Sequence, residues 1–455
     1  MATSLRIGAG SAYWGDMVEP AVELAEKGEV QYIGFDFLAE LTMSVFQRAK
    51  MRDPNQGFIP DTLSILRRVI PAASRNHVRL ILNGGAANPV ACGFAVKRLC
   101  NEMGFEHLRV AVVTGDDILD QLNALDTGAR LRNLDTGEVG LGRIQGDIVA
   151  AHAYIGSEGI VDALGMGADI VITGRVADSS LYVAPMMYEF GWTFEDADWD
   201  RLGAAITLAH IVECAEGCTG GMSNHWSDVE RPWEIGFPIL EVTDGANGVT
   251  GSITKVSGSG GLVNEWTIKE HLLYELHDPN NYLMPDGIAN FTTLQLSEPA
   301  DGVVRIERMT GKPRPATLKA QIGYKEGWLA EGQAVLSWPD ALGKAARARE
   351  FLTHRIADLG LHLDALEMSY LGRNTLRYGL AAEDGDPDPA EVVLRVAAKA
   401  KTREEADAVR REVTHLWTMG GVGTAFGAPL PLRQVIGLWP TLVPREAVHV
   451  EAQII

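Results

Sequence analysis

Arg175 and Asp178 are side chains whose types and spacing fit the binding and conversion of an anionic substrate. They follow an apolar run, within the segment 174–180. Arginine can hold a carboxylate or a phosphate through paired hydrogen bonds, and a nearby aspartate can cap a helix or accept a proton. The alternative is an ion pair between Arg175 and Asp178 themselves. We expect Asp178 to act in catalysis, and the predicted substrate-binding residues here are Gly174, Arg175, Ser179 and Ser180.

The segment Asn83-Gly84-Gly85 offers a second means of holding an anion. It follows the apolar run 78–82 and precedes a helix expected to begin near Pro89. Backbone N–H groups in such a turn, together with those of a helix N-terminus, can bind an oxyanion or a phosphate. A plain turn between a strand and a helix is the alternative.

Glycine and aromatic residues follow the first apolar run, in the segment 8–16. Gly8 and Gly10, with Asp36 after the second run, fit part of a dinucleotide-binding pattern. Tyr13 stands where that pattern needs a third glycine, and its ring would block the close approach of helix and strand. The segment can otherwise be a simple backbone turn or a substrate loop. The substrate loop would use Gly10, Ser11, Tyr13, Trp14 and Asp16.

Besides Asp178, four side chains are candidates for acid–base or nucleophilic chemistry. Asp36 ends the second apolar run, and His152 lies inside the run 148–155, where an imidazole can move a proton or simply be buried. Glu213 and Cys214 come near the end of a helix expected over about 198–216. They could pair an acid with a thiol, although Cys214 could equally be a small buried residue.

The sequence contains only weak patterns for metal binding. His210, Cys214 and Cys218 recur at intervals of four, but Gly217 is expected to end the helix before the third of them. A zinc site is therefore not favoured. Mg²⁺ could be held by one or two carboxylates, and the available aspartates are Asp16, Asp36, Asp116 and Asp117.

Alternating apolar runs and helical stretches must position these groups. Six strand-like runs occur before residue 180, at 5–8, 30–35, 78–82, 108–113, 148–155 and 168–173. Strands that alternate with helices predict an α/β fold with a mostly parallel sheet and helices on both faces. The ligand site is expected beyond the carboxyl ends of these strands.

The order of strand-like and helical segments changes in the rest of the chain. Residues 1–315 are expected to form the core domain, with strand–helix repeats to about residue 230 and an extended insertion or second layer over 231–315. Residues 316–455 read as strand, helix, strand, strand, helix, strand, which predicts a ferredoxin-like α+β domain.

The composition of the chain indicates which partners and which cellular location to expect. The formal net charge of −20 disfavours a nucleic-acid partner, because phosphates would be repelled. No apolar run is long enough to span a membrane, and no export leader is apparent, so a cytoplasmic location is expected. Four cysteines in 455 residues fit free thiols in a reducing compartment. A homo-oligomer is expected on general grounds.

Several motifs together resemble a known family. They are the segment 8–16, Tyr32-Ile33-Gly34-Phe35-Asp36, Asn83-Gly84-Gly85, the segment 172–180, Glu213-Cys214, Thr219-Gly220-Gly221, Gly236-Phe237-Pro238, Gly260-Gly261-Leu262-Val263 and the segment 278–286. From about residue 4 to 340 the chain is similar to the acyclic terpene utilisation family of AtuA type. The C-terminal part resembles a small ferredoxin-like domain that some members carry.

The resemblance implies a role in the breakdown of branched terpenoids through acyl-CoA intermediates. We expect a carbon–carbon lyase that acts on a 3-hydroxyacyl-CoA-type or carboxylate substrate, with CoA as part of the substrate and Thr219, Gly220 and Gly221 among the substrate-binding residues. A related hydratase or thioester hydrolase is the first alternative. A non-catalytic acyl-CoA-binding or assembly subunit and a nicotinamide-dependent oxidoreductase are the others.

Overall fold

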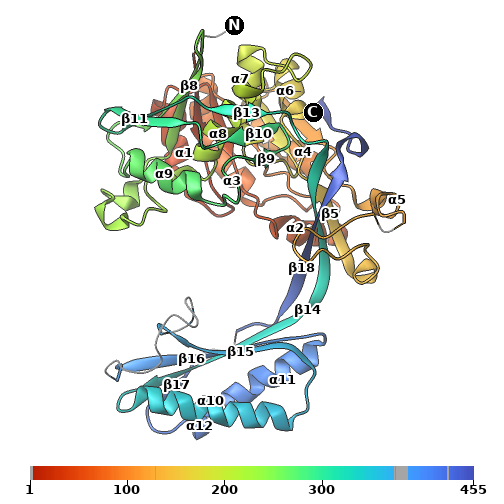
Figure 1. Ribbon diagram of the computed structural model, residues 1–455, viewed down its shortest axis with the longest axis vertical. Helices are drawn as coiled ribbons and strands as arrows, with labels where there is room; N and C mark the ends of the chain where they lie inside the picture. The colour runs from red at the N-terminus through yellow and green to blue at the C-terminus, as the bar shows by residue number, and fades with distance from the viewer. Residues whose placement is uncertain (1–3, 129, 374, 376–387, 428–429) are drawn as a thin grey trace. The chain divides into compact units, whose positions relative to one another are not determined.

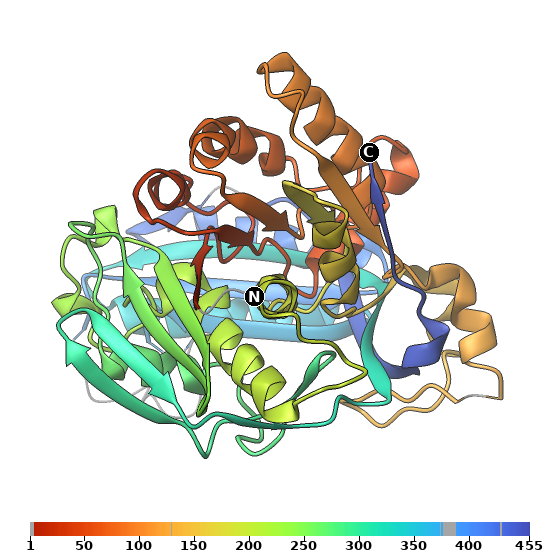
Figure 2. The same ribbon diagram turned by 90° about the horizontal axis from the view of Figure 1, so that it is seen from above.

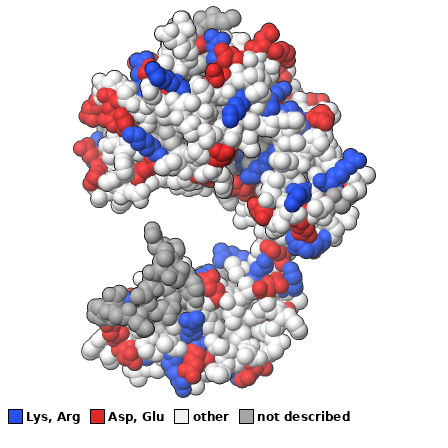
Figure 3. Space-filling view, viewed as in Figure 1, with Lys and Arg blue, Asp and Glu red and all other residues white. Residues whose placement is uncertain are grey.

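The computed structural model describes residues 4–128, 130–373, 375, 388–427 and 430–455. The described chain forms two compact units, one made of residues up to 323 together with 438–455, and one made of residues 324–437. Among the described residues, no helix is both long and apolar enough to span a membrane. On the face shown in Figure 3, acidic and basic side chains are interspersed in both units. The acidic surplus is therefore not gathered into one patch on that face.

The larger unit is built on a ten-stranded sheet with a parallel centre. The central strands, in spatial order, are β1 (Ser4–Ala9), β2 (Tyr32–Phe35), β3 (Arg79–Leu82), β6 (Ile170–Thr173) and β4 (Val110–Thr114). Each pairs with its neighbour in parallel. Their apolar side chains are buried on both faces, as expected of a parallel sheet covered by helices.

Helices cover the sheet in two layers (Figures 1 and 2). One layer packs α1 (Glu19–Lys27), α3 (Asp61–Arg75) and α4 (Pro89–Glu102) against each other. The other packs α6 (Glu158–Gly165), α7 (Ser180–Phe190) and α8 (Trp199–Glu213). The predicted helices on both faces are therefore present. The other α-helices among the described residues of this unit are α2 (Thr42–Arg52), α5 (Leu122–Leu125) and α9 (Glu265–Leu273).

Antiparallel strands close both edges of the sheet, which corrects the prediction of a mostly parallel sheet. Beyond β1 lie β7 (Pro238–Gly245), β8 (Gly248–Lys255), β12 (Val303–Glu307) and β11 (Gln295–Ala300), and beyond β4 lies β19 (Glu451–Ile454). Four neighbouring pairs are parallel and five are antiparallel. The sheet is mixed because hairpin-connected strands, which need no crossover helix, extend it. Much of the segment 231–315 thus enlarges the first sheet.

The strand predicted at 148–155 exists as β5 (Ile148–Ala153), but it does not join this sheet. It pairs with β14 (Thr317–Ser337), and the Tyr154 N–H donates to the Lys319 carbonyl over 2.8 Å. β4 and β6 are direct neighbours, so no position between them remains for β5. Its partner is a strand far away in the sequence.

A small second sheet lies against α8. It contains β9 (Tyr282–Met284), β10 (Gly287–Asn290) and β13 (Thr310–Lys312). The backbones of α8 and β13 approach closely, since a Cβ atom on Gly203 would lie 2.5 Å from the Gly311 Cα atom. α8 is therefore covered along most of its surface, which explains why every residue from Leu202 to Glu213 is buried.

In its described residues, the smaller unit packs three α-helices against a sheet. Its elements are the second part of β14, α10 (Ala341–Asp358), β15 (Leu363–Leu371), β16 (Glu391–Ala400), α11 (Arg403–Thr414), α12 (Leu416–Met419), β17 (Thr424–Phe426) and the first part of β18 (Arg433–Pro444). Leu336, Leu352, Leu394 and Val413 share its core. The order of elements agrees with the sequence pattern, while the likeness to a ferredoxin-like domain stays a prediction. Residues 438–455 return to the larger unit, where β19 pairs with β4, so the observed division differs from a boundary at 315/316.

Candidate active site

The loops after β2 and β3 meet at the carboxyl ends of the parallel strands. Asn83 Nδ2 donates to Asp36 Oδ1 over 2.6 Å, and Asn83 Oδ1 accepts the Phe37 N–H over 2.8 Å. Both polar side chains are buried. Burial raises the pKa of Asp36 well above its usual value, and the nearby Asp178 raises it further, while Arg175 opposes the shift.

Arg175 occupies the centre of this buried cluster. Its guanidinium donates to the Leu38 carbonyl over 3.1 Å, to the Val176 carbonyl over 2.9 Å, and to Asp178. The ring of Tyr154 lies 4.6 Å from the guanidinium carbon. Arg175 is 1% exposed and does not line the cavity described below. The ion pair with Asp178 is thus formed, and Arg175 has no free face for a substrate anion.

His152 lies behind this cluster rather than in a cavity. Its Nδ1 is 3.0 Å from Asp116 Oδ2, an oxygen that also accepts the Arg175 N–H over 2.9 Å. A Cβ atom on Gly174 would lie 2.4 Å from the other Asp116 oxygen, so this turn requires glycine. His152 and Asp116 therefore hold the Arg175 loop in place, and the buried interpretation of His152 is the one that the structure supports.

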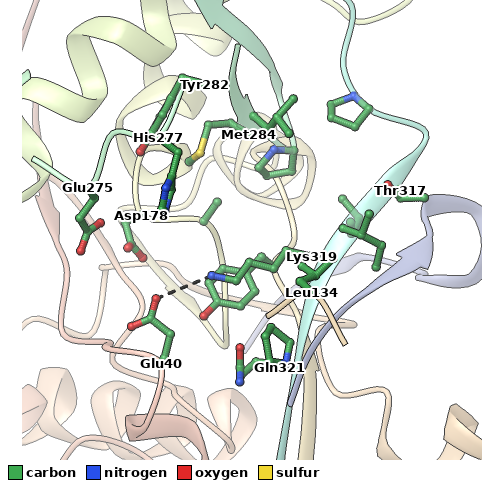
Figure 4. A pocket seen from close by; sticks show the side chains of 18 of the residues that line it. Glu40, Leu134, Asp178, Glu275, His277, Tyr282, Met284, Thr317, Lys319 and Gln321 are labelled. Atoms are coloured by element: carbon green, nitrogen blue, oxygen red, sulfur yellow. Dashed lines mark ion pairs between the residues drawn. The ribbon is translucent and has the colours of Figure 1, made fainter. Parts of the chain in front are cut away.

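A cavity of about 820 Å³ opens next to the cluster. Of the predicted catalytic residues, Asp178 and Glu213 line it. Asp178, Glu275, His277 and Tyr282 gather on one side of the cavity, with Lys319 and Glu40 nearby (Figure 4). The lining also includes an apolar group, namely Leu134, Leu283, Met284, Leu318, Leu438 and Leu442. The cavity therefore combines an acidic end with an extensive apolar wall.

Glu213 is the buried acid of this cavity. Burial raises its pKa well above the usual value, Asp178 and Glu275 raise it further, and Arg175 lowers it. Its Oε2 atom is buried and has no hydrogen-bond partner. The pKa of Asp178 is also raised by burial, against the opposing effect of Arg175. A carboxyl with a raised pKa suits proton transfer near neutral pH.

His210 contacts the other oxygen of this acid, and Tyr282 in turn contacts His210. Glu213 Oε1 lies 2.9 Å from His210 Nδ1, and the Tyr282 hydroxyl lies 3.2 Å from the same nitrogen. Burial lowers the pKa of His210 to about 4, so its ring is neutral at pH 7. A hydrogen on Nε2 would have no acceptor, because that atom is buried without a partner. The hydrogen is therefore assigned to Nδ1, from which it is donated to Glu213.

Replacing His210 by Phe should displace the pH dependence of activity. The Phe ring can still stack on Phe291, whose ring centroid lies 5.4 Å from that of His210. Loss of the donated hydrogen bond raises the pKa of Glu213 further, because its charged form loses a partner. The acidic limb of the kcat/KM profile should then move to higher pH. A lower rate with an unchanged profile would mean that His210 has only a packing role.

Lys319 is the basic side chain of the cavity. Its ammonium lies 3.7 Å from Glu40 and 4.8 Å from the centroid of the Tyr154 ring (Figure 4). It projects from β14, where the neighbouring Leu318 and Ala320 are buried. Lys319 lines the cavity, and its side chain reaches toward Glu40 (Figure 4). With its side chain 44% exposed, Lys319 can approach a ligand.

The remaining predicted binding residues do not line the cavity. Ser11 donates to the Asp36 carbonyl over 2.8 Å, and Ser180 donates to Asp286 over 2.5 Å. Burial, then Glu213, raises the pKa of the Cys214 thiol, which therefore stays protonated at neutral pH. The positions that lie outside the lining are Gly10, Ser11, Tyr13, Trp14, Asp16, Asp36, Asn83, Gly84, Gly85, His152, Gly174, Arg175, Ser179, Ser180, Cys214, Thr219, Gly220 and Gly221. They support the loops around the site or lie away from it.

The loops 10–16 and 215–221 form a separate cluster. The two backbone N–H groups of Ala12 and Met17 donate to Asp16, while Tyr13 is 52% exposed. Burial raises the pKa of Glu216 to about 7, and the charge of Asp16 contributes to the shift. A substrate loop in this position would act away from the cavity, so substrate binding there stays a prediction.

Replacing Glu216 by Gln should stabilise the protein at high pH. The folded protein holds the Glu216 proton up to about pH 7, whereas the unfolded chain releases it near pH 4.5. Stability from this group is therefore complete below pH 4.5 and is lost as the pH rises to 7. The quantity compared is the free energy of unfolding of the variant minus that of the parent. This difference should be up to about 3 kcal/mol larger at pH 8 than at pH 4. Urea unfolding at both pH values tests this, and equal differences would contradict it.

Metal ligands are not gathered at this site. Within the ranges that the structure describes, no three His, Cys, Asp or Glu side chains are placed to hold a metal ion. Asp116 bonds to His152, and Asp117 lies 3.6 Å from Lys50. A role for Mg²⁺ stays a prediction.

Sequence reasoning missed several lining residues. Lys319 was assigned to a strand without a chemical role, and Tyr282 belongs to a motif that carried only the family resemblance. His210 was considered only as a metal ligand. The run of Glu275, His277 and Asp278 is a local signal that could have been used, since charged residues cluster there before the strand β9.

Comparison with known proteins identifies the family. No curated protein and no solved structure gives a significant match to this chain. The model of one protein family, described as acyclic terpene utilisation family protein AtuA, matches residues 5–454. The chain therefore belongs to the acyclic terpene utilisation family of AtuA type.

Proposed function

We propose that this protein is an enzyme of acyclic terpenoid breakdown, which cleaves a carbon–carbon bond in a branched 3-hydroxy acid. The proposed substrate is either the free carboxylate or its CoA thioester. The observation that carries the proposal is the cavity itself, in which the buried acid Glu213 and the cation Lys319 accompany an apolar wall. Family membership supports a role in terpene utilisation.

The proposed reaction is a reverse aldol cleavage. Glu213 removes the proton of the 3-hydroxyl group, the C3–O electrons form a ketone, and the bond between C2 and C3 breaks. The electron pair passes to C2 and is delocalised onto the thioester oxygen as an enolate, or, with the free acid, onto the carboxylate as an ene-diolate that carries one further negative charge. Lys319 stabilises this negative charge, and Glu213 returns its proton to C2.

The geometry supports this division of roles. Glu213 lines the cavity and has one oxygen held by His210, so its second oxygen, which is buried and has no partner, is the one proposed to take the hydroxyl proton. The apolar side chains suit a branched hydrocarbon tail, because contact with Leu134, Met284 and Leu318 removes it from water.

Product analysis tests the proposal. The purified protein is incubated with branched 3-hydroxy acids and with their CoA thioesters, and the products are identified by mass spectrometry. A ketone with acetate or acetyl-CoA is expected. Loss of water would instead indicate a hydratase, and release of free CoA would indicate a thioester hydrolase. Binding without any product would favour a non-catalytic subunit.

A further inference from the structure

We infer that the substrate enters as a free monocarboxylate rather than as a CoA thioester, with its one negative charge beside Lys319. This inference rests on the proposed function, since it names the form of the substrate at the same site. It depends on three observations about the larger unit: the charges that line the cavity, the partners of the nearby arginines, and the volume of the cavity.

Acidic side chains far outnumber basic ones in the lining. The carboxyl groups are those of Glu40, Asp135, Asp178, Glu213, Glu275 and Asp278. Among the described residues that line the cavity, Lys319 is the one Lys or Arg side chain, and His277 is the one imidazole. Each further negative charge on a ligand would lie near carboxylates in a partly dry site, where repulsion is strong. The lining therefore fits a ligand with a single negative charge.

The nearest arginines are already paired. Arg445 donates to the carbonyls of Pro285 and Pro315 over 2.6 and 3.1 Å. Arg314 is paired with Glu158, and Arg445 lies 3.6 Å from the same carboxylate. With Arg175 also committed to Asp178, these guanidinium groups have carboxylate or carbonyl partners. They do not offer an unpaired cluster for the pyrophosphate and 3′-phosphate of CoA.

The volume of the cavity fits a ligand that is smaller than an acyl-CoA. A cavity of about 820 Å³ falls in the range that encloses a drug-sized molecule. A branched hydroxy acid fits within it, with its tail on the apolar wall and its carboxylate near Lys319. An acyl-CoA would have to leave its nucleotide and phosphates outside, where the chain as a whole has a net charge of −20.

Kinetics with paired substrates test the inference. 3-Hydroxy-3-methylbutyrate and its longer branched homologues are compared with their CoA thioesters on the full chain. We expect kcat/KM to be at least about tenfold higher for the free acids, and Lys319→Gln to raise their KM by about tenfold or more, since a charged hydrogen bond is lost. Lys27→Gln is the control, because Lys27 is an exposed lysine paired with Glu23 on α1.

The outcomes separate the inference from the proposed function. Cleavage of the thioesters with equal or higher efficiency overturns the inference and leaves the lyase in place. If neither form is cleaved, the lyase proposal fails. Calorimetric titration with both forms then shows whether the free acid or the thioester binds more tightly. Binding of the free acid that Lys319→Gln weakens would uphold the inference, and tighter binding of the thioester would overturn it.

Discussion

Replacing Glu213 by Gln should lower kcat by about 10²- to 10⁴-fold, the usual loss when a general acid or base is removed. The amide keeps the shape of the carboxyl group and can still contact His210 Nδ1, but it cannot accept the hydroxyl proton. Substrate binding depends more on Lys319 and the apolar wall, so KM should change much less than kcat. Steady-state kinetics with a substrate that turns over give both constants.

Glu216→Gln provides the matched control for this variant. Glu216 is also largely buried with a raised pKa, but it does not line the cavity. Its replacement removes a similar carboxyl group and should leave kcat within a factor of about two, as remote substitutions usually do. If Glu213→Gln retains full activity while folded, Glu213 is not the base.

Replacing Arg175 by Met should give the largest loss of stability. Removal of the guanidinium leaves Asp178 and Asp36 without their opposing charge, and two buried carbonyls without donors. Arg175 and Asp36 are buried, whereas the Asp178 side chain is 34% exposed, so the loss should approach about 3–5 kcal/mol, which is the cost of removing one partner of a fully buried ion pair. The free energy of unfolding, measured in urea near pH 7, should fall by that amount.

Arg67→Ala is the matched control for an exposed pair in the same unit. Arg67 lies 3.5 Å from Glu102, and both side chains are more than half exposed. Solvent screening makes such a pair worth about 0–1 kcal/mol. Equal losses for the two variants would contradict the central position assigned to Arg175. Recovery of stability at low pH in Arg175→Met, where the carboxyls are protonated, would support it.

The central parallel strands, and the polar cluster at their carboxyl ends, could be predicted from local sequence patterns. Each of Asp36, Asn83 and Asp178 stands shortly after an apolar run, and parallel strands bring their carboxyl ends to one edge. Glu213 was identified from the end of an apolar helix. These predictions needed only the spacing of apolar residues and the rule for parallel crossovers.

The rest of the site depends on long-range pairing that no local pattern contains. Lys319 reaches the cavity because β14 pairs with β5, although Lys319 follows Tyr154 by about 165 residues in the sequence, far beyond any local periodicity. Tyr282 meets His210 because a small sheet packs on α8. The antiparallel edges were missed for the same reason, since pairs such as β19 (Glu451–Ile454) with β4 (Val110–Thr114) join segments that lie far apart in the sequence.

The most direct test of the central claim uses a branched 3-hydroxy acid labelled with ¹³C at both C2 and C3. Its two labelled carbons are coupled in the ¹³C spectrum as long as the bond between them exists. The account predicts that the parent protein abolishes this coupling, with one label appearing in a ketone and the other in a shortened acid, and that Glu213→Gln does not. If the coupling persists in every product, carbon–carbon cleavage at this site is contradicted.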